Sequence, residues 1–455
     1  MTSIQPNQLA LLHKLRRSLG PFSGVEFLWI GFLLMVIATG IYALYLQISE
    51  GHIITGMRDN VVWGVYIVNF IFFMGVSYAG ALVSGSLHLF RAHWRYPIIR
   101  MAEFITVISL LIGPLFILLC IGRLDRLPFL VTYGRIQSPI TWDVIAISTD
   151  LFGCFIFLYL AILKDLAILR DQDLLSMPNW RKKMYKILAL GYVGNKEQRK
   201  RLKTATDIMS AMIIAIAIIV YSVLAWIFSV TLQPGWHSTI FGPYFVIQAV
   251  FSGTGVLIVI MWIYRKIYHL EEYITRKHFV NIGILMMVLA ALNGYFTFSE
   301  YITKWYGSEE NDEKLIRILF ERYYWEFVFS NYIGVLAPMI VIGIPRLRQI
   351  KPITIAAVIM IIALWLNRYL IVVPTQENPY LPIQDSRAEW ILYRATWVEW
   401  SLIAAGVALF CLLFTLLSKF VPFVHLADTH KDVEGEIEAD GATTFFDEKE
   451  SVKPA

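Results

Sequence analysis

The fold is indicated by one stretch of the chain, which reads Ser138-Pro-Ile-Thr-Trp-Asp-Val-Ile-Ala-Ile-Ser-Thr-Asp-Leu-Phe-Gly-Cys154. It has the apolar character of a membrane-spanning helix, yet it contains Asp143 and Asp150. Their spacing places both carboxylates on nearly the same helix face, about 10 Å apart along the axis. Because a charged side chain in hydrocarbon costs about 2.5 kcal/mol or more, both residues are candidates for a functional site. In the structural alternative, Asp143 is a charge at a helix N-terminus and Asp150 is a packing residue bonded to Ser or Thr.

The rest of the chain has the same apolar character. Of the 455 residues, 57% are hydrophobic and 16% are charged, which excludes an ordinary soluble enzyme. We predict an all-α polytopic membrane protein with about ten transmembrane helices, because ten apolar stretches are long enough to cross about 30 Å of hydrocarbon. These stretches start near residues 22, 61, 98, 139, 205, 240, 278, 323, 352 and 395.

The distribution of basic residues predicts the orientation. An even number of helices places both termini on one side, and eleven lysines and arginines between residues 164 and 203 mark that side as cytoplasmic. We therefore expect a cytoplasmic N-terminal segment (1–21), a membrane domain (22–424) and an inner basic loop (164–204). The last residues, 425–455, contain nine acidic residues and three lysines, which predicts a disordered cytoplasmic tail.

A short internal repeat suggests how the helices are grouped. Trp63-Gly-Val-Tyr66 at the second helix is similar to Phe241-Gly-Pro-Tyr244 at the sixth, and Trp142-Asp143 at the fourth is similar to Trp325-Glu326 at the eighth. Each pair has the same predicted orientation, as in a parallel repeat. We predict two four-helix bundles, formed by helices 2–5 and 6–9, with helices 1 and 10 outside them.

The residues that usually hold redox centres are scarce. Cys120, Cys154 and Cys411 lie in apolar runs without CxxC spacing, so they suggest neither a disulfide framework nor a metal site. None of the nine histidines falls at the predicted middle of a span, where haem ligands would be expected. We therefore predict no metal site and no bound cofactor. If the protein handles electrons, a partner supplies the redox centre.

Polar residues gather at the predicted outer side, around the loop between the third and fourth helices. Such a cluster beside apolar helix walls suits an amphipathic ligand, and a quinol is the natural candidate. Its oxidation releases protons, so Asp143 is the predicted base, with Arg123 and Arg126 orienting the ring oxygens. Further quinone-binding candidates are Arg58, Asp59, Tyr133, Arg135 and Trp142. The alternative is that these residues only anchor the helices at the interface.

Three further carboxylates, Asp150, Glu103 and Asp207, run toward the predicted cytoplasmic side. Their positions permit a proton path. The alternative is a set of separate ion pairs with neighbours such as Arg100 and Lys203. Glu326 and Glu399 are expected to stabilise helix N-termini instead.

Several motifs occur together in an order that is similar to one family. They are Arg100-Met-Ala-Glu-Phe-Ile-Thr106, Gly122-Arg-Leu-Asp-Arg-Leu127, Tyr133-Gly-Arg-Ile-Gln-Ser-Pro-Ile-Thr-Trp-Asp-Val-Ile-Ala-Ile-Ser148, Gly235-Trp-His-Ser-Thr-Ile-Phe-Gly-Pro-Tyr-Phe245, Arg368-Tyr-Leu-Ile-Val-Val-Pro374 and Thr396-Trp-Val-Glu399. Over almost the whole ten-helix region the chain resembles the NrfD/PsrC family, the membrane subunits of polysulfide reductases.

The resemblance implies a bacterial inner-membrane subunit without a cofactor of its own. Such a subunit uses menaquinone or menaquinol as substrate and exchanges electrons with an iron–sulfur subunit on the outer face. It implies further partners, namely multihaem cytochrome or molybdopterin subunits and a second related membrane subunit, but no nucleic acid. The length suits alternative complex III. In place of the histidine that such subunits tend to carry before the Gly-Arg motif, this chain has Cys120.

Two other function classes remain open at this stage. A proton-coupled secondary transporter also uses a parallel repeat and buried carboxylates, but its site normally lies at mid-membrane on broken helices. Here the polar cluster is predicted at the outer edge. A redox-silent anchor subunit is the second alternative.

Overall fold

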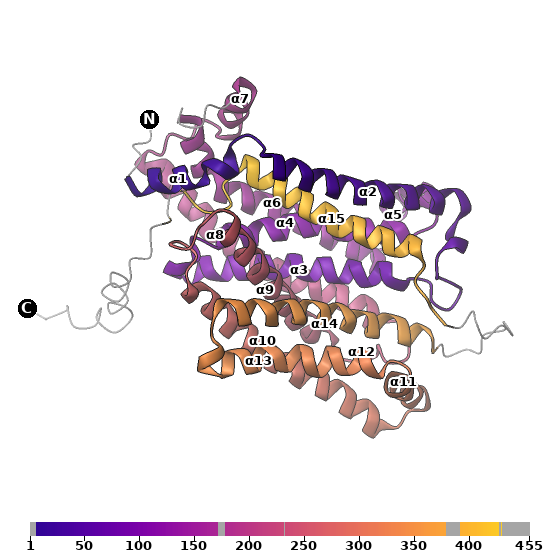
Figure 1. The fold of residues 1–455 in the computed structure, drawn as a ribbon. Coiled ribbons are helices and arrows are strands. Elements are labelled where there is room, and N and C mark those ends of the chain that lie inside the picture. Colours follow the sequence, from indigo (N-terminus) through magenta and orange to yellow (C-terminus); the bar gives the residue numbers. More distant parts are fainter. Residues whose placement is uncertain (1–5, 172–177, 232, 379–391, 427–428, 430–455) are drawn as a thin grey trace, which may run out of the picture.

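The computed structural model describes residues 6–171, 178–231, 233–378, 392–426 and 429. In this part of the chain all regular structure is helical (Figure 1). The helices are α1 (Pro6–Leu19), α2 (Gly24–Glu50), η1 (His52–Ile54), α3 (Gly64–Leu89), η2 (His93–Arg95), α4 (Ile99–Cys120), η3 (Leu124–Arg126), α5 (Phe129–Thr132), α6 (Pro139–Asp171), α7 (Asn179–Leu188), α8 (Lys196–Ser229), α9 (Phe241–Ile267), α10 (Arg276–Gly307), α11 (Glu310–Glu321), α12 (Tyr324–Val328), η4 (Phe329–Ile333), α13 (Gly334–Gly343), η5 (Pro345–Leu347), α14 (Ile350–Gln376) and α15 (Trp397–Phe420).

Ten helical segments are long and apolar enough to cross a membrane, which confirms the predicted fold class. Nine of them are single helices, and the eighth, Tyr324–Gly343, is composed of α12, η4 and α13. The long helices lie side by side (Figure 1), with α1 and α7 at one end of the molecule and α11 at the other. We call these the α1 end and the α11 end.

The spans form the two predicted groups. One bundle contains α3, α4, α6 and α8, and the other contains α9, α10, α13 and α14. The bundles meet where α3 packs on α9, and this contact depends on a glycine. A Cβ atom built on Gly253 would lie 2.0 Å from the Cβ atom of Ala79, so only glycine permits this helix separation.

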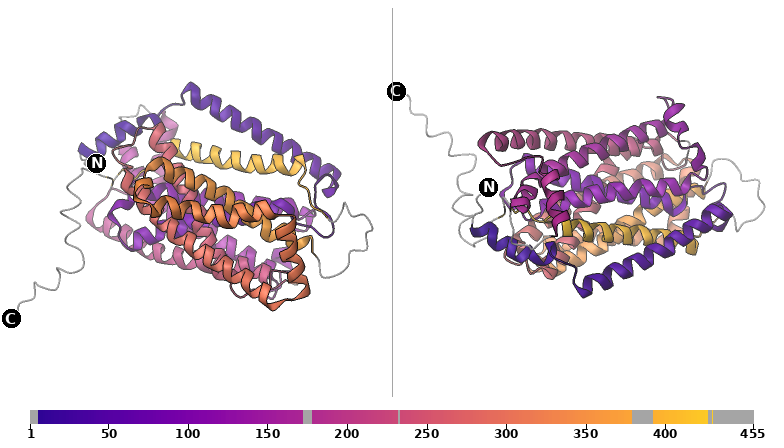
Figure 2. Two further views of the ribbon diagram at one scale, coloured as in Figure 1. Left: turned by 60° about the horizontal axis from the view of Figure 1, so that its bottom comes forward. Right: turned by 90° about the horizontal axis from the view of Figure 1, so that it is seen from above.

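Helices α2 and α15 form a separate pair that packs beside α4, and α2 lies on the outside of the molecule (Figure 2). Close approach again requires a glycine, because a Cβ atom on Gly40 would lie 2.3 Å from that of Ala405. At the α1 end, Lys419 Nζ forms an ion pair of 2.7 Å with Glu26 Oε1. Many large apolar side chains of α2 are exposed, as expected of a helix that faces lipid.

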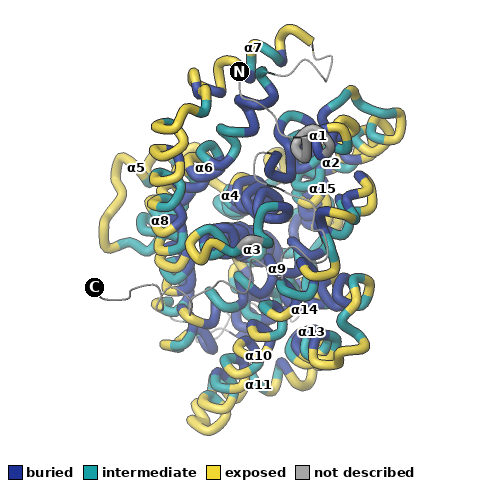
Figure 3. Tube along the Cα trace, turned by 90° about the vertical axis from the view of Figure 1, so that its left-hand side faces the viewer, coloured by how far each residue is buried: buried dark blue, intermediate teal, exposed yellow. Residues whose placement is uncertain are grey.

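The predicted inner basic loop is mostly helical. Helix α6 continues to Asp171, and α8 begins at Lys196, well before the predicted start near residue 205. Good helix formers explain the extension, and the side chain of Asn195 caps α8 by accepting a 2.7 Å hydrogen bond from the Gln198 backbone. In the view onto the α1 end (Figure 3), α7 lies at the edge of the bundle. Almost all of the predicted acidic tail lies outside the described residues.

The eighth span contains a π turn, η4, at Phe329–Ile333. There Asn331 donates from Nδ2 to the carbonyl oxygen of Phe327 at 3.2 Å. Its Oδ1 atom accepts from Asn367 Nδ2 at 3.0 Å, and Asn367 Oδ1 accepts from Gln248 Nε2 at 2.7 Å. A chain of amides therefore crosses the interior of the second bundle from the π turn to α9.

Candidate functional site

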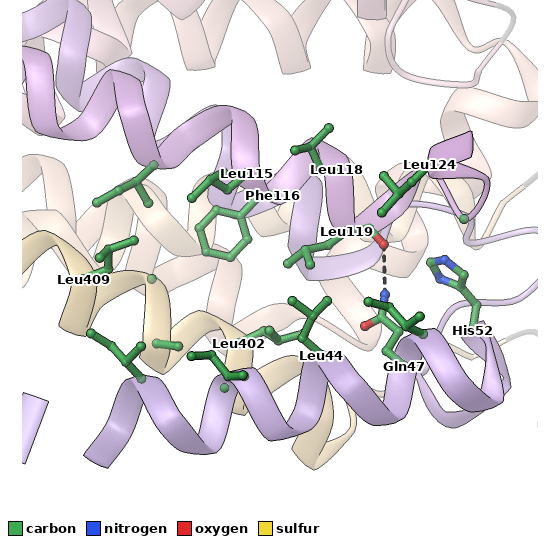
Figure 4. Close-up of a pocket in the computed structure, with 18 of the residues that line it drawn as sticks. Leu44, Gln47, His52, Leu115, Phe116, Leu118, Leu119, Leu124, Leu402 and Leu409 are labelled. Atoms are coloured by element: carbon green, nitrogen blue, oxygen red, sulfur yellow. Dashed lines mark hydrogen bonds between the residues drawn. The ribbon is translucent and has the colours of Figure 1, made fainter. Parts of the chain in front are cut away.

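A cavity of about 490 Å³ lies between α2, α4 and α15 (Figure 4). We call it the trough. Its walls are almost entirely aliphatic, with leucine and isoleucine side chains from all three helices, and Phe116 lies along one side. The small residues Gly40, Ala405 and Gly406 also line it. Large apolar side chains would normally fill such a space, so the small residues help to keep it open.

The polar groups of the trough are confined to its α11 end, where Gln47 and His52 line the cavity (Figure 4). Gln47 donates from Nε2 to the carbonyl oxygen of Leu119 at 2.9 Å. Its Oε1 atom accepts a 2.6 Å hydrogen bond from the hydroxyl of Tyr66, which is fully buried on α3. The trough therefore combines a long apolar body with one polar end, as an amphipathic ligand requires.

A buried carboxylate supports this polar end. Glu399 is fully buried at the start of α15 and accepts hydrogen bonds from the backbone N–H groups of Gly56, at 2.7 Å, and Thr396, at 2.9 Å. The hydroxyl of Tyr393 also donates to it. The expectation that Glu399 stabilises a helix N-terminus is confirmed, because Thr396 and Glu399 form a capping box. The same carboxylate also fixes the loop that follows His52.

His52 lies beyond the end of α2 and is half-buried. Burial lowers the pKa of this imidazole, and the negative charge of Glu399 offsets only part of that effect. His52 is therefore neutral near pH 7, with one ring nitrogen able to accept a proton.

The predicted acidic face of α6 lies on the other side of α4. Asp150 is fully buried, and its Oδ1 atom accepts a 3.4 Å hydrogen bond from Cys154 Sγ, while Oδ2 has no partner among the described residues. Asp143 is partly exposed, and its carboxylate forms no hydrogen bond or ion pair with any described residue. The buried phenol of Tyr78 lies within electrostatic range of both carboxylates. The structure therefore brings Asp143, Asp150 and Tyr78 into one region.

The predicted arginines lie elsewhere. Arg123 forms a two-pronged pair with Asp125, at 3.0 and 2.8 Å, and both side chains are more than half exposed. Arg58 donates to the carbonyl oxygens of Thr55 and Met57 in its own loop. Four other predicted residues are exposed, namely Arg126, Tyr133, Arg135 and Asp59. Trp142 is partly buried and donates to the carbonyl oxygen of Ile136. None of these side chains is bonded to Asp143.

Of the predicted proton-path residues, Glu103 lies in a buried ion cluster. Its carboxylate is 3.6 Å from Arg100 Nη1 and 3.7 Å from His88 Nε2. Arg100 also forms an ion pair of 2.9 Å with the fully buried Asp165. His88, which lies beside Glu103, lines the same cavity as Asp207. Among the described residues no hydrogen bond or ion pair joins Asp150, Glu103 and Asp207 to one another.

Sequence reasoning missed Gln47, Tyr66, His52 and Asp165 as parts of polar sites. Gln47 is a single amide near the end of an apolar run, and His52 follows it by five residues. These two residues were the only hints of a polar site in the sequence, and their spacing does not match a known ligand-binding motif. Among the described residues, no group of three or more His, Cys, Asp or Glu side chains is arranged to hold a metal ion.

Comparison with known proteins identifies the family. The family model described as polysulphide reductase, NrfD, matches residues 54–379, well over half of the chain. The chain belongs to the NrfD family. The matched region of this NrfD-family chain begins at η1 and ends after α14, so it includes both four-helix bundles, whereas α2 and α15 lie outside it.

Three curated relatives have similar sequences. A protein named as a membrane subunit of dimethyl sulfoxide reductase, from Halobacterium salinarum, is 29% identical over 51% of this chain and 50% of its own length. A protein named as a selenate reductase subunit, from Mesobacillus selenatarsenatis, is 21% identical over 84% of the NrfD-family chain and 91% of its own. The Hdr-like menaquinol oxidoreductase integral membrane subunit of Archaeoglobus fulgidus is 22% identical over 86% and 91%. The chain thus spans about half the length of the first relative and most of the other two.

The three relatives are all named as subunits of oxidoreductases, two of them explicitly as membrane subunits. The ten candidate spans and the relatives together make the chain a multi-pass membrane protein.

Proposed function

We propose that this protein is the quinone-interacting membrane subunit of a respiratory oxidoreductase complex, and that it exchanges electrons with an iron–sulfur subunit docked at the α11 end. The trough carries the proposal, because its apolar body and single polar end match a quinone ring with an isoprenoid tail. A relative that covers most of the chain is named as a menaquinol oxidoreductase subunit, which favours menaquinone or menaquinol as the substrate. We further propose that the α1 end faces the cytoplasm of a bacterial cell.

In this proposal the polar end of the trough holds the ring. Gln47 is held in place by its hydrogen bonds to Tyr66 and to the Leu119 carbonyl, so the second N–H of its amide is positioned to donate to a ring oxygen in the trough. Oxidation of a quinol to a quinone releases two protons and two electrons. The neutral imidazole of His52 would accept the two protons one after the other and pass each to solvent, because the ring is only half-buried; the two electrons would go to an iron–sulfur centre of the partner subunit.

The acidic face of α6 is the second proposed position for the ring. There Asp143 acts as the base, and Arg123 and Arg126 would have to move inward from the exposed loop to orient the ring oxygens. Asp150, Glu103 and Asp207 then belong to a proton path toward the α1 end. The trough is favoured because Gln47 is buried and already held by two hydrogen bonds, whereas Arg123 is bonded to Asp125.

A binding titration tests both the function and the position. The purified full-length protein is titrated with a fluorescent menaquinol analogue. We compare wild type with Ile41→Trp, which places an indole in the trough from an exposed position of α2. Leu34→Trp is the matched control, because Leu34 is an exposed aliphatic residue of the same helix that does not line the trough. Asp143→Asn tests the other position.

We expect saturable binding that Ile41→Trp weakens at least about tenfold, with the control and Asp143→Asn unchanged, since a filled cavity loses the ligand's apolar contacts. A loss confined to Asp143→Asn would move the ring to α6. If folded wild type shows no saturable binding, quinone interaction is wrong. A redox-silent anchor or a proton-coupled transporter then becomes the better description.

A further inference from the structure

A second cavity, of about 420 Å³, opens at the α1 end, remote from the trough. We call it the basic cavity. Its walls come from the end of α3, from η2, from α6 and α8, and from the segment after α15. Five arginine and lysine side chains line it, and Asp207 is the one carboxylate among its described lining residues. The cations are Arg91, Arg95, Lys164, Arg199 and Lys203.

The floor of the cavity is a buried ion cluster in which Arg100 is paired with two carboxylates, Asp165 and Glu103. Arg100 is fully buried, and its Nη2 atom donates to Asp165 Oδ2 at 2.9 Å and to the carbonyl oxygen of Ala161 at 2.8 Å. Asp165 also accepts a 3.2 Å hydrogen bond from the backbone of Leu426. The buried carboxylates are therefore engaged by Arg100 and by the backbone. With five cations and one carboxylate, the described lining of the cavity carries an excess of positive charge.

His425 connects the floor to the cavity. It lines the cavity, is 5% exposed, and its Nδ1 atom lies 3.1 Å from Arg100 Nη2. Its Nε2 atom is buried and has no hydrogen-bond partner among the described residues. A buried ring nitrogen without a partner costs free energy, and a ligand in the cavity can remove that cost.

The charges on the walls act on His425. Burial, and after it the positive charges of Arg100, Lys164 and Arg95, together with His88, hold the pKa of His425 well below its ordinary value. These cations therefore disfavour a proton on the ring. An anion bound beside the ring would be attracted by the same cations.

We propose that the basic cavity binds a phosphate group, carried either by the headgroup of an anionic phospholipid or by a soluble phosphate. Guanidinium groups match phosphate oxygens geometrically, and two of the lining arginines, Arg91 and Arg199, are exposed and available to a ligand from solution or from the lipid surface. Leu160 and Leu202 also line the cavity and supply apolar contact for the part of a lipid next to its headgroup. The site lies at the end opposite the trough, so it is independent of the quinone proposal.

The test measures binding to the purified full-length protein in a neutral detergent. Fluorescent phosphatidylglycerol is titrated against wild type, with phosphatidylcholine of the same chain length as the zwitterionic comparison. Inorganic pyrophosphate is then added as a competitor. The double variant Arg199→Gln with Lys203→Gln removes two wall cations one turn apart on α8. The matched control is Lys196→Gln with Lys200→Gln, which has the same helix, spacing and charge change but lies outside the cavity lining.

We expect the cavity variant to weaken phosphatidylglycerol binding at least about tenfold and the control to change it less than about twofold, because charge-assisted hydrogen bonds to phosphate are strong and local. All four positions are exposed, so folding should be retained, and thermal unfolding checks this. Competition by pyrophosphate at similar concentration would identify a soluble phosphate as the source. Retained lipid binding against excess pyrophosphate would identify the lipid headgroup.

Two results would overturn the proposal. Equal losses in the cavity variant and in the control would mean that phosphatidylglycerol responds to the general positive charge of the α1 end. The other result is the absence of saturable phosphatidylglycerol binding by the folded wild type, which would mean that the basic cavity holds no phosphate group.

Discussion

The two faces of α4 accommodate polar groups in different ways. Toward α6, the helix places the charged side chains of Arg100 and Glu103 directly in the interior, where Asp165 completes the ion cluster. Toward α2 and α15, α4 contributes aliphatic side chains, Phe116 and one backbone carbonyl. The polar side chains there are Gln47, which Tyr66 holds by a hydrogen bond, and His52. The charged cluster therefore depends on ion pairs between α4 and α6, whereas the cavity is the space that three helices leave unfilled.

The largest expected effect is on the charged face. Arg100→Gln leaves Asp165 and Glu103 buried without their main cation, and breaking a buried ion pair typically costs about 3–5 kcal/mol. We expect the free energy of unfolding to fall by about that amount. Denaturant titration in detergent micelles, followed by circular dichroism, measures it. A loss below about 1 kcal/mol would show that water reaches this cluster and that the two faces differ less than the structure indicates.

The next effect is on the trough. Gln47→Leu removes the acceptor of the Tyr66 hydroxyl and the polar group nearest the proposed ring. We expect the affinity for the menaquinol analogue to fall about tenfold, the value of one hydrogen bond of about 1.4 kcal/mol. Ser49→Ala is the control, because that exposed hydroxyl of the same helix bonds only to the carbonyl of Leu46. If Gln47→Leu binds the analogue as tightly as wild type, the ring does not bind at this end of the trough.

A smaller effect concerns pH. Burial lowers the pKa of His52, so the unfolded chain binds this proton more readily than the folded chain. Above the unfolded pKa of about 6.5, the ring is neutral in both states and costs the folded protein no stability. As the pH falls below that value, the free energy of unfolding decreases, until the pH reaches the lowered pKa of the folded state.

We expect His52→Gln to lose less stability than wild type between pH 7.5 and 5.5, by at most about 1 kcal/mol, since the ring is only half-buried. Thermal unfolding at both pH values gives the comparison. An identical pH response in the two proteins would place His52 in free contact with solvent.

The smallest effect is expected at the exposed pair. Arg123→Gln breaks the contact with Asp125, but both side chains are more than half exposed, so the melting temperature should stay within the error of measurement. Together with Arg100→Gln, this variant makes the same chemical change in two environments. A clear loss of quinol-analogue binding in Arg123→Gln would show that the loop closes over a ring bound beside Asp143.

The ten spans were predictable because each needs only a long apolar stretch, and hydropathy depends little on tertiary contacts. The grouping into two bundles followed from short repeated motifs at helix starts. The burial of Asp150 was also predictable, since its position near mid-span leaves no route to water.

Other features depend on contacts between distant segments. The partner of Arg100 is Asp165, which lies 65 residues away, and Gln47 meets Leu119 across 72 residues. Neither pairing has a local pattern. The exposed position of Arg123 was missed for a similar reason, because its pairing with Asp125 competes with any inward orientation.

The π turn in the eighth span has a consequence for chain length. A π turn is an α-helix with one residue inserted, and a single residue rotates all following side chains by about 100°. Here the inserted residue lets Asn331 keep its bond to Phe327 while it meets Asn367. Deleting one residue from Phe329–Ile333 would leave the hydropathy of the span almost unchanged, but it would turn Val335 and Pro338, now buried, out of their positions. The hydrogen bonds of Asn331 therefore fix the rotational register of this helix, whereas hydropathy alone is satisfied with or without the extra residue.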